Sequence, residues 1–489
     1  MSTSTIRSQI TKSVKAKLAR IHEGGRPKVL DLFSGCGGIS LGFEKAGCII
    51  VGGVERDADA AASFRWNFRD KRRFPPAIWL SELNHDITKT QPSMLARNAG
   101  VEIREAVDIL VGGPPCQAFA RIGRAKLRSV TADPEAWLND PRADLYKSYL
   151  RYVRDFAPCA LFMENVPDFL AHGSDNVADE VCSNLEALGY RSHYTLMNAS
   201  FYGVPQHRER MILVALHASI DAAWEFPRPT HHADPPAGYK GTRSSALSRT
   251  AGVSDTEGEH AYLQQPPDEA AGATMGRPAA TLVADAINDL PRIEIRSIGA
   301  RFSREARIWP YRSGRSSHYA RIMRRWLGHV SKGGITDHLT RYLPRDFPIF
   351  KDMHPGEQYP EMHRRQERRR DKAALRAGIR PGTASWRRLT EKLVPPYPPD
   401  KFPNKWYRLV SSEPSRTLLA HLGKDGYTHI HPTEPRVISV REAARLQSFP
   451  DGFAFRGPMN SMFRQIGNSV PPLMAACIAT RIVRAMRKR

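Results

Sequence analysis

The sequence predicts an α/β fold in which a mostly parallel sheet carries helices on both faces. Short apolar runs alternate with helix-like stretches from Lys28 to His232, a pattern typical of strands joined by crossover helices. The chain has 489 residues, enough for this core and a second, smaller domain. Hydrophobic residues make up 41% and charged residues 25%, which is ordinary for a globular protein and excludes global disorder.

The first elements form two strand–helix pairs. Continuous apolar runs predict strands at VLDLF (29–33) and IIVGGVE (49–55). The stretches between and after them predict helices at ISLGFEKAG (39–47) and DADAAASFRWNF (57–68). The alternation then continues with predicted strands at 106–113, 159–166 and 210–216 and predicted helices at 145–156 and 177–190, which extends the parallel sheet.

Composition divides the chain into four expected segments. Residues 1–27 form a polar, basic arm, which we expect to be solvated, with a short helix over Thr11–His22. Residues 28–232 form the α/β domain, and residues 233–434 form a separate lobe that is first rich in Ala, Gly, Pro and Ser and then strongly basic. Residues 435–489 end in an amphipathic stretch, which we expect to return to the α/β domain.

The charge of the chain indicates a polyanionic partner. Lys and Arg number 73 against 50 Asp and Glu, a net charge of +23, which favours nucleic acid over the alternatives of a merely basic surface or an acidic membrane. There is no run of eighteen apolar residues and no secretory signal, so we expect a cytoplasmic protein without a membrane span.

The six cysteines do not form a recognisable framework. They contain no CxxC pair and no Cys/His grouping at zinc spacing, so we expect neither a disulfide scaffold nor a metal site. Five of them suit buried or loop positions. Cys116 differs because it follows Gly112-Gly113-Pro114-Pro115 directly after a predicted strand. A rigid, turn-bound thiol at a strand end is a candidate nucleophile.

A glycine-rich turn follows the first predicted strand. Gly35, Gly37 and Gly38 precede a helix, an arrangement that lets a ligand approach the backbone. Glu55 ends the next strand twenty residues after Gly35, where a carboxylate can accept hydrogen bonds from ribose hydroxyls. The spacing is neither GxGxxG nor a P-loop, so a nucleoside with little phosphate fits best. Asp86 is a candidate contact for an adenine amino group, or alternatively a helix cap before Thr88.

Three further charged residues lie at the ends of predicted strands: Glu164 at the end of one, and Arg208 and Arg210 at the start of another. Glu164 ends an apolar run, so it is expected at the same sheet edge as Cys116, where a dry pocket could make it a proton donor. Arg208 and Arg210 are separated by one residue and can face one site. A surface ion pair and a solvent-facing basic edge are the respective alternatives.

In order along the chain, these segments closely resemble the DNA cytosine-5 methyltransferase family of bacterial restriction-modification systems. The resemblance covers residues 28–232 and 405–480, in the unpermuted order of the family's motifs. It rests on DLFSGCGG, VER, HDI, GGPPCQAFA, DPRADL, MENV, NASFYGVPQHRER, RVISVREAARLQSFPDGF and QIGNSVPP.

The resemblance implies a Rossmann-like domain that uses S-adenosylmethionine, without a metal, to methylate C5 of a cytosine in double-stranded DNA. It implies that Cys116 attacks C6, that Glu164 acts at N3, and that Arg210 contacts the base carbonyl while Arg208 lies nearer the thiolate. The target base must be flipped out of the duplex. The implied cofactor contacts are Phe33, Gly35, Gly38, Glu55, Arg56, Asp86, Ile87, Pro115, Leu145, Asn468, Ser469 and Val470, with Gln465 and Gly467 shaping the last loop.

The same resemblance assigns residues 233–434 to target recognition, with basic side chains on phosphates and a few reading base edges. We expect a monomer in the bacterial cytoplasm, associated with the nucleoid through DNA, and the resemblance leaves room for a separate cognate endonuclease. An enzyme acting on transfer RNA would be expected to have a shorter basic block, and an amino-methyltransferase would carry an aromatic residue at Cys116. The intact Cys116 and Glu164 disfavour a catalytically silent DNA-binding protein.

Overall fold

The computed structural model describes residues 3–69, 84–115, 145–170, 176–234, 262–265, 276–294, 308–331, 333–424 and 426–488. The chain divides into two compact units. Unit 1 comprises Met1–Ala280, Ala454–Gly457 and Ser469–Arg489, and unit 2 comprises Thr281–Phe453 and Pro458–Asn468. The four segments expected from composition, with their assigned roles, stay a prediction.

Unit 1 contains a six-stranded sheet among its described residues, in the order β2-β1-β3-β4-β6-β5. The neighbours β2, β1, β3 and β4 are parallel, whereas β6 is antiparallel to both β4 and β5. This confirms the mostly parallel sheet. The strands are β1 (Lys28–Leu32), β2 (Ile49–Val54), β3 (Ile109–Gly112), β4 (Ala160–Asn165), β5 (Tyr190–Asn198) and β6 (Glu209–His217).

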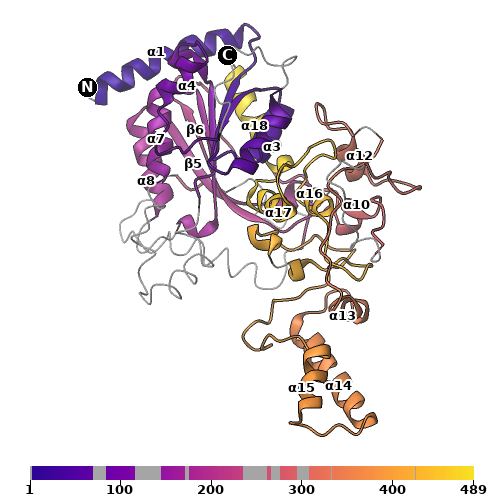
Figure 1. Ribbon diagram of the computed structural model, residues 1–489. Helices are drawn as coiled ribbons and strands as arrows, with labels where there is room; N and C mark the ends of the chain where they lie inside the picture. The colour runs from indigo at the N-terminus through magenta and orange to yellow at the C-terminus, as the bar shows by residue number, and fades with distance from the viewer. Residues whose placement is uncertain are drawn as a thin grey trace. The chain divides into compact units, whose positions relative to one another are not determined.

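Helices cover both faces of this sheet, with α7 and α8 on one side and α3 and α18 on the other (Figure 1). Side-chain caps define where two of them begin: Asp57 accepts a hydrogen bond from Ala60 N before α3, and Asn176 from Ala178 N before α8. The helices of unit 1 after α1 are α2 (Gly38–Lys45), α3 (Ala58–Phe68), α4 (Pro92–Asn98), α5 (Ile103–Ala106), α7 (Leu145–Phe156), α8 (Val177–Ala187) and α18 (Pro472–Arg487), with short 3-10 turns η3 (Pro167–Leu170) and η4 (Ala199–Tyr202).

The N-terminal segment is a packed helix, α1 (Thr3–His22), and not the solvated arm with a short helix that we expected. One stripe of the helix is buried, at Ile10, Val14, Lys17, Leu18 and Ile21. The Lys17 ammonium donates hydrogen bonds to the carbonyls of Val107, Phe156 and Ala157 at 2.6, 2.8 and 2.9 Å. These bonds compensate for burying the charge, so α1 is a structural part of unit 1.

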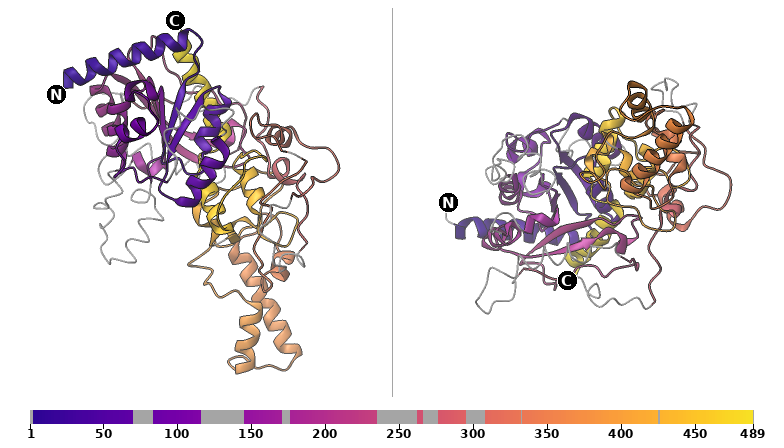
Figure 2. Two further views of the ribbon diagram at one scale, coloured as in Figure 1. Left: turned by 45° about the horizontal axis from the view of Figure 1, so that its top comes forward. Right: turned by 90° about the horizontal axis from the view of Figure 1, so that it is seen from below.

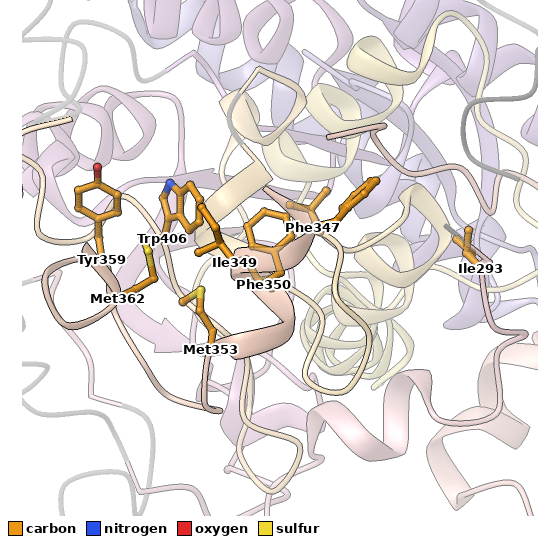
Figure 3. Packing of buried hydrophobic residues seen from close by; sticks show 10 residues of the cluster. Ile293, Phe347, Ile349, Phe350, Met353, Tyr359, Met362 and Trp406 are labelled. Carbon is orange, nitrogen blue, oxygen red and sulfur yellow. The ribbon is translucent and has the colours of Figure 1, made fainter. Parts of the chain in front are cut away.

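Unit 2 is built from helices and irregular segments around its own core. Figure 3 shows the core side chains, among them Phe350 and Trp406, whose rings meet edge to face with centroids 5.1 Å apart. Trp406 also stacks on Tyr427 at 4.8 Å. The elements of unit 2 are α10 (Val283–Ile287), α12 (His318–Arg324), α13 (Phe347–Asp352), α14 (Tyr359–Arg376), α15 (Ala384–Leu393), η5 (Ala420–Gly423), η6 (Gly426–His429), α16 (Val440–Leu446) and α17 (Met459–Asn468).

One stretch, Met459–Arg487, is long and apolar enough to span a membrane by length and composition alone. Most of its apolar window is buried inside the protein, as in the core helices of many proteins. It comprises α17 and α18.

Candidate active site at the carboxyl edge of the sheet

The loop between β1 and α2 adopts an unusual backbone conformation. Phe33, Gly35 and Gly37 all have positive φ angles, of 55°, 53° and 104°, a region that side chains with a Cβ rarely adopt. Gly38 follows, and a Cβ added there would lie 2.4 Å from the carbonyl oxygen of Val470. The loop therefore needs glycine both for its turn and for its close contact with the segment after Asn468.

Glu55 lies at the end of β2 and is fixed beside this loop. One carboxylate oxygen accepts a hydrogen bond from Gly35 N at 2.9 Å, and the other accepts one from Asp57 N at 2.7 Å. Burial raises the pKa of Glu55, opposed by these backbone hydrogen bonds. Each oxygen keeps a second lone pair, so the carboxylate can still accept hydrogen bonds from a ligand. Arg56, next in the chain, is exposed.

A buried acid that the sequence reasoning missed joins β1 to the start of α2, on either side of the loop. Asp31 in β1 accepts a 2.7 Å hydrogen bond from Ser40 Oγ in the first turn of α2. Burial raises the pKa of Asp31 to about 7. The signal for it was the single acid inside the apolar run VLDLF.

The segment around Asp86 lies beside Glu55, because His85 N donates a 2.6 Å hydrogen bond to the Glu55 carbonyl. The Asp86 carboxylate itself accepts hydrogen bonds from Thr88 Oγ1 and Thr88 N, at 2.7 and 3.0 Å, and they lower its pKa. These bonds close a turn and do not cap a helix, because the next helix, α4, begins only at Pro92, so the alternative of a helix cap before Thr88 is wrong. Ile87 is buried, and its carbonyl accepts a hydrogen bond from Arg151.

The remaining predicted cofactor contacts are only partly brought together. Ser469 Oγ lies 3.3 Å from Cys36 Sγ, and Val470 lies against Gly38, so both are at the loop. Leu145 begins α7 and is half-buried, as is Pro115. Asn468 is the exposed last residue of α17 and belongs to unit 2, as do Gln465 and Gly467.

Glu164 and Arg210 form an ion pair at the carboxyl edge of the sheet, with 2.9 Å between Arg210 Nε and Glu164 Oε1. The strand directions produce this pairing, since β6 runs antiparallel to β4 and begins where β4 ends. Glu164 is 8% exposed and Arg208 is 1% exposed. The alternatives of an exposed ion pair and a solvent-facing basic edge are therefore wrong for these residues.

The chain leading to Cys116 is held against the end of β4. A Cβ added to Gly113 would lie 2.9 Å from Glu164 Oε2, so the glycine lets the loop pass close to the carboxylate. Asn165 Nδ2 donates a 3.3 Å hydrogen bond to the carbonyl of Pro114. Cys116 itself lies outside the described residues.

Asn198, which the sequence reasoning also missed, holds the backbone in place just before β6. Its buried side-chain oxygen accepts hydrogen bonds from Ser200 N, Ser200 Oγ and Arg208 N, at 3.1, 3.0 and 3.2 Å. It thereby fixes the backbone of Arg208, two residues before Arg210. Across the part of the chain that the structure describes, no group of three His, Cys, Asp or Glu residues is arranged to hold a metal ion.

The sequence and the fold are similar to those of known DNA methyltransferases. The family profile described as C-5 cytosine-specific DNA methylase matches residues 27–484. M.OihORF3336P of Oceanobacillus iheyensis, described as a type II methyltransferase, is 38% identical over 93% of this chain and 94% of its own length. The type II methyltransferase M.XorII of Xanthomonas oryzae is 30% identical over 95% and 86%. A crystal structure described as a DNA modification methyltransferase from an E. coli prophage aligns with a TM-score of 0.60 and 22% identity, over 94% of this chain and all of that one, and shares the fold.

Proposed function

The chain belongs to the C-5 cytosine-specific DNA methylase family and is a DNA (cytosine-5) methyltransferase, and from this premise we propose that it acts through a covalent bond between Cys116 and a flipped-out cytosine. The observation that carries the proposal is the buried Glu164–Arg210 pair, which lies beside Gly113 and thus three residues from Cys116.

In this mechanism the Cys116 thiolate attacks C6 of the cytosine and forms a C–S bond. Glu164 donates a proton or hydrogen bond to N3, so the electron pair displaced from the C5–C6 double bond makes C5 nucleophilic. After C5 has gained the methyl group, water acting as a base removes the C5 proton, the C5–C6 double bond re-forms, the thiolate leaves, and any proton that Glu164 gave to N3 returns to Glu164. Arg210 orients Glu164 and contacts the base carbonyl, with Arg208 closer to the thiolate.

S-adenosylmethionine, the methyl donor of this family, supplies an electrophilic methyl on a sulfonium. The described residues fit such a nucleoside, because three of the four residues of the Gly35–Gly38 loop are glycines, the Cys36 side chain is buried, and the Glu55 carboxylate beside the loop can accept further hydrogen bonds. We propose that Phe33, Gly35, Gly38, Glu55, Arg56, Asp86, Ile87, Pro115, Leu145, Asn468, Ser469 and Val470 hold it. No metal is needed for this chemistry.

A cytosine stacked in a duplex is out of reach of a thiol, so the base must leave the helix, at a cost of a few kcal/mol that backbone contacts must offset. We assign these contacts and the choice of sequence to residues 233–434. The type II names of the relatives support a role in restriction-modification, with a separate cognate endonuclease. We propose that the enzyme acts as a monomer in the bacterial cytoplasm, at the nucleoid.

The test is methyl transfer from labelled S-adenosylmethionine to duplex DNA and, separately, to total transfer RNA. We expect label in DNA only; transfer to RNA with none to DNA would overturn the proposal. Cys116→Ala is expected to abolish both turnover and the stable adduct with DNA containing 5-fluorocytosine. Cys477→Ala, at a half-buried cysteine in α18, is the matched control and should retain both. An adduct that survives Cys116→Ala would assign the nucleophile elsewhere.

A further inference from the structure

Helices α14 and α15 of unit 2 form a strongly basic hairpin, residues 359–393. In Figures 1 and 2 the two helices lie side by side and extend away from the remainder of unit 2. The hairpin holds eleven Lys and Arg against four Asp and Glu, a net of +7 out of the chain's +23 in 35 of its 489 residues. We propose that the outer face of this hairpin binds the phosphate backbone of duplex DNA, an inference that rests on the proposed function.

One face of α14 is anchored to the body of unit 2 by ion pairs. Arg365 pairs with Glu357 at 2.6 Å, and Arg369 pairs with Asp352 at 2.7 Å. Arg365 also donates a hydrogen bond to the carbonyl of Asp352. Because these two arginines are four residues apart, they lie on one side of the helix. This side is the one that faces α13 and the turn after it.

The outer face of α14 carries a second row of cations without such partners. Arg364, Arg368, Lys372 and Arg376 are all exposed. None of them forms an ion pair with any described residue of the chain. Their spacing of four residues places them along one side of the helix, with about 6 Å of rise between neighbours. They therefore form a row of free positive charges on a rigid support.

Helix α15 contributes little to the core of unit 2. It has no buried residue, and Arg387, Arg388 and Lys392 on it are exposed. What holds it is its Thr383 cap and the stacking of Arg370 on Trp386, at 4.4 Å from the ring centroid. Repulsion between these positive side chains destabilises the hairpin. Because α15 has no packing role that would offset this cost, we infer that the hairpin's charges serve to bind a polyanion, which neutralises them.

The chemistry of this face matches phosphates better than base edges. Its cations are long, flexible and regularly spaced, so they can each reach a backbone phosphate. Contacts of this kind bind without sequence preference and release condensed counterions. The hairpin would therefore strengthen binding to any duplex and leave sequence choice to other residues of unit 2.

The experiment measures binding of the full chain to a random-sequence 30-base-pair duplex by fluorescence anisotropy over a series of salt concentrations. The test variant is R364Q/R368Q/K372Q, in which glutamine preserves helix propensity. The matched control R7Q/K12Q/K15Q also removes three exposed cations, from α1. Helix α1 lies at the other sheet edge from Glu164, since Thr11 meets His217 at the end of β6. Circular dichroism verifies that both variants are folded.

We expect the hairpin variant to lower the slope of log K against log salt by about 2.7, from about 0.9 per phosphate contact, and to bind at least tenfold more weakly at 0.1 M salt. The α1 variant should keep the wild-type slope. An unchanged slope in the hairpin variant, or an equal loss in both variants, would overturn the inference. Methyl transfer to DNA by the wild type, measured in parallel at low salt, shows independently whether the proposed function holds.

Discussion

At the scale of single residues, the pair of Glu164 and Arg210 gives the sharpest test of the active site. With Arg210 Nε at 2.9 Å and both side chains largely buried, Glu164 is fixed in position before any substrate binds. Glu164→Gln keeps the shape but removes the acid, so we expect kcat to fall by roughly 10²–10⁴-fold. Affinity for S-adenosylmethionine should stay within about twofold, because the Gly35–Gly38 loop and Glu55 follow β1 and β2, whereas Glu164 lies in β4.

Steady-state kinetics and isothermal titration with S-adenosylhomocysteine measure these two quantities. Glu102→Gln, at an exposed glutamate before α5, is the control and should match the wild type in both. If Glu164→Gln retains wild-type kcat, Glu164 has no part in the chemistry.

Residue types at strand ends were readable from the sequence, but their partners were not. Glu164 and the arginines stood next to apolar runs, and such runs locate strand ends. The contact between Glu164 and Arg210 depends on β6 lying antiparallel beside β4, a pairing between distant segments that local patterns do not specify. The same holds for Asn198, whose three hydrogen bonds form only once β6 is in place.

At the scale of elements, α1 makes a testable contribution to stability through Lys17. Burial lowers the pKa of Lys17 from 10.5 to about 8. Between about pH 8 and 10.5 the unfolded chain therefore binds more protons at this residue than the folded one, and the free energy of unfolding rises with pH. We expect Lys17→Met to lack this rise, which is on the order of 3 kcal/mol for a shift of this size.

The measurement is urea unfolding of wild type and variants from pH 7.5 to 10.5, with Lys17→Met compared at each pH. Lys12→Met replaces an exposed lysine on the same helix and should reproduce the wild-type profile. A parallel profile for Lys17→Met and wild type would mean that Lys17 keeps its ordinary pKa in the folded protein.

The elements that the sequence predicted correctly are those with an unambiguous pattern. The strands at 29–33, 49–55, 106–113, 159–166 and 210–216 are continuous apolar runs, as buried strands of a covered sheet should be, and each is present. Strand β5 was missed because exposed Arg191 and half-buried His193 interrupt it. Helix α1 was expected to be solvated because a lysine in a basic segment does not signal burial, and only tertiary contacts give Lys17 its three carbonyls.

At the scale of the whole molecule, the candidate cofactor site draws on two distant parts of the chain. The Gly35–Gly38 loop and Glu55 come from the first strands, whereas Ser469 and Val470 come from the C-terminal part of unit 1. The contact of Gly38 with the Val470 carbonyl ties the two ends together. A ligand bound there should consequently stabilise the whole of unit 1 against unfolding, and not only the residues that it contacts.

This gives a prediction for thermal unfolding. S-adenosylhomocysteine at about 100 times its Kd should stabilise the folded wild type by about 2.7 kcal/mol, which raises the Tm by several degrees. In the wild type, Gly35 N and Asp57 N donate hydrogen bonds to the two Glu55 carboxylate oxygens, at 2.9 and 2.7 Å. Glu55→Gln replaces one of these oxygens with an NH₂ group, so one of the two donors loses its acceptor and the loop geometry changes. We expect that variant to show less than half of the wild-type Tm shift at the same ligand concentration. Differential scanning fluorimetry with Glu102→Gln as the control measures the shift, and a full wild-type shift in Glu55→Gln would exclude Glu55 from the cofactor site.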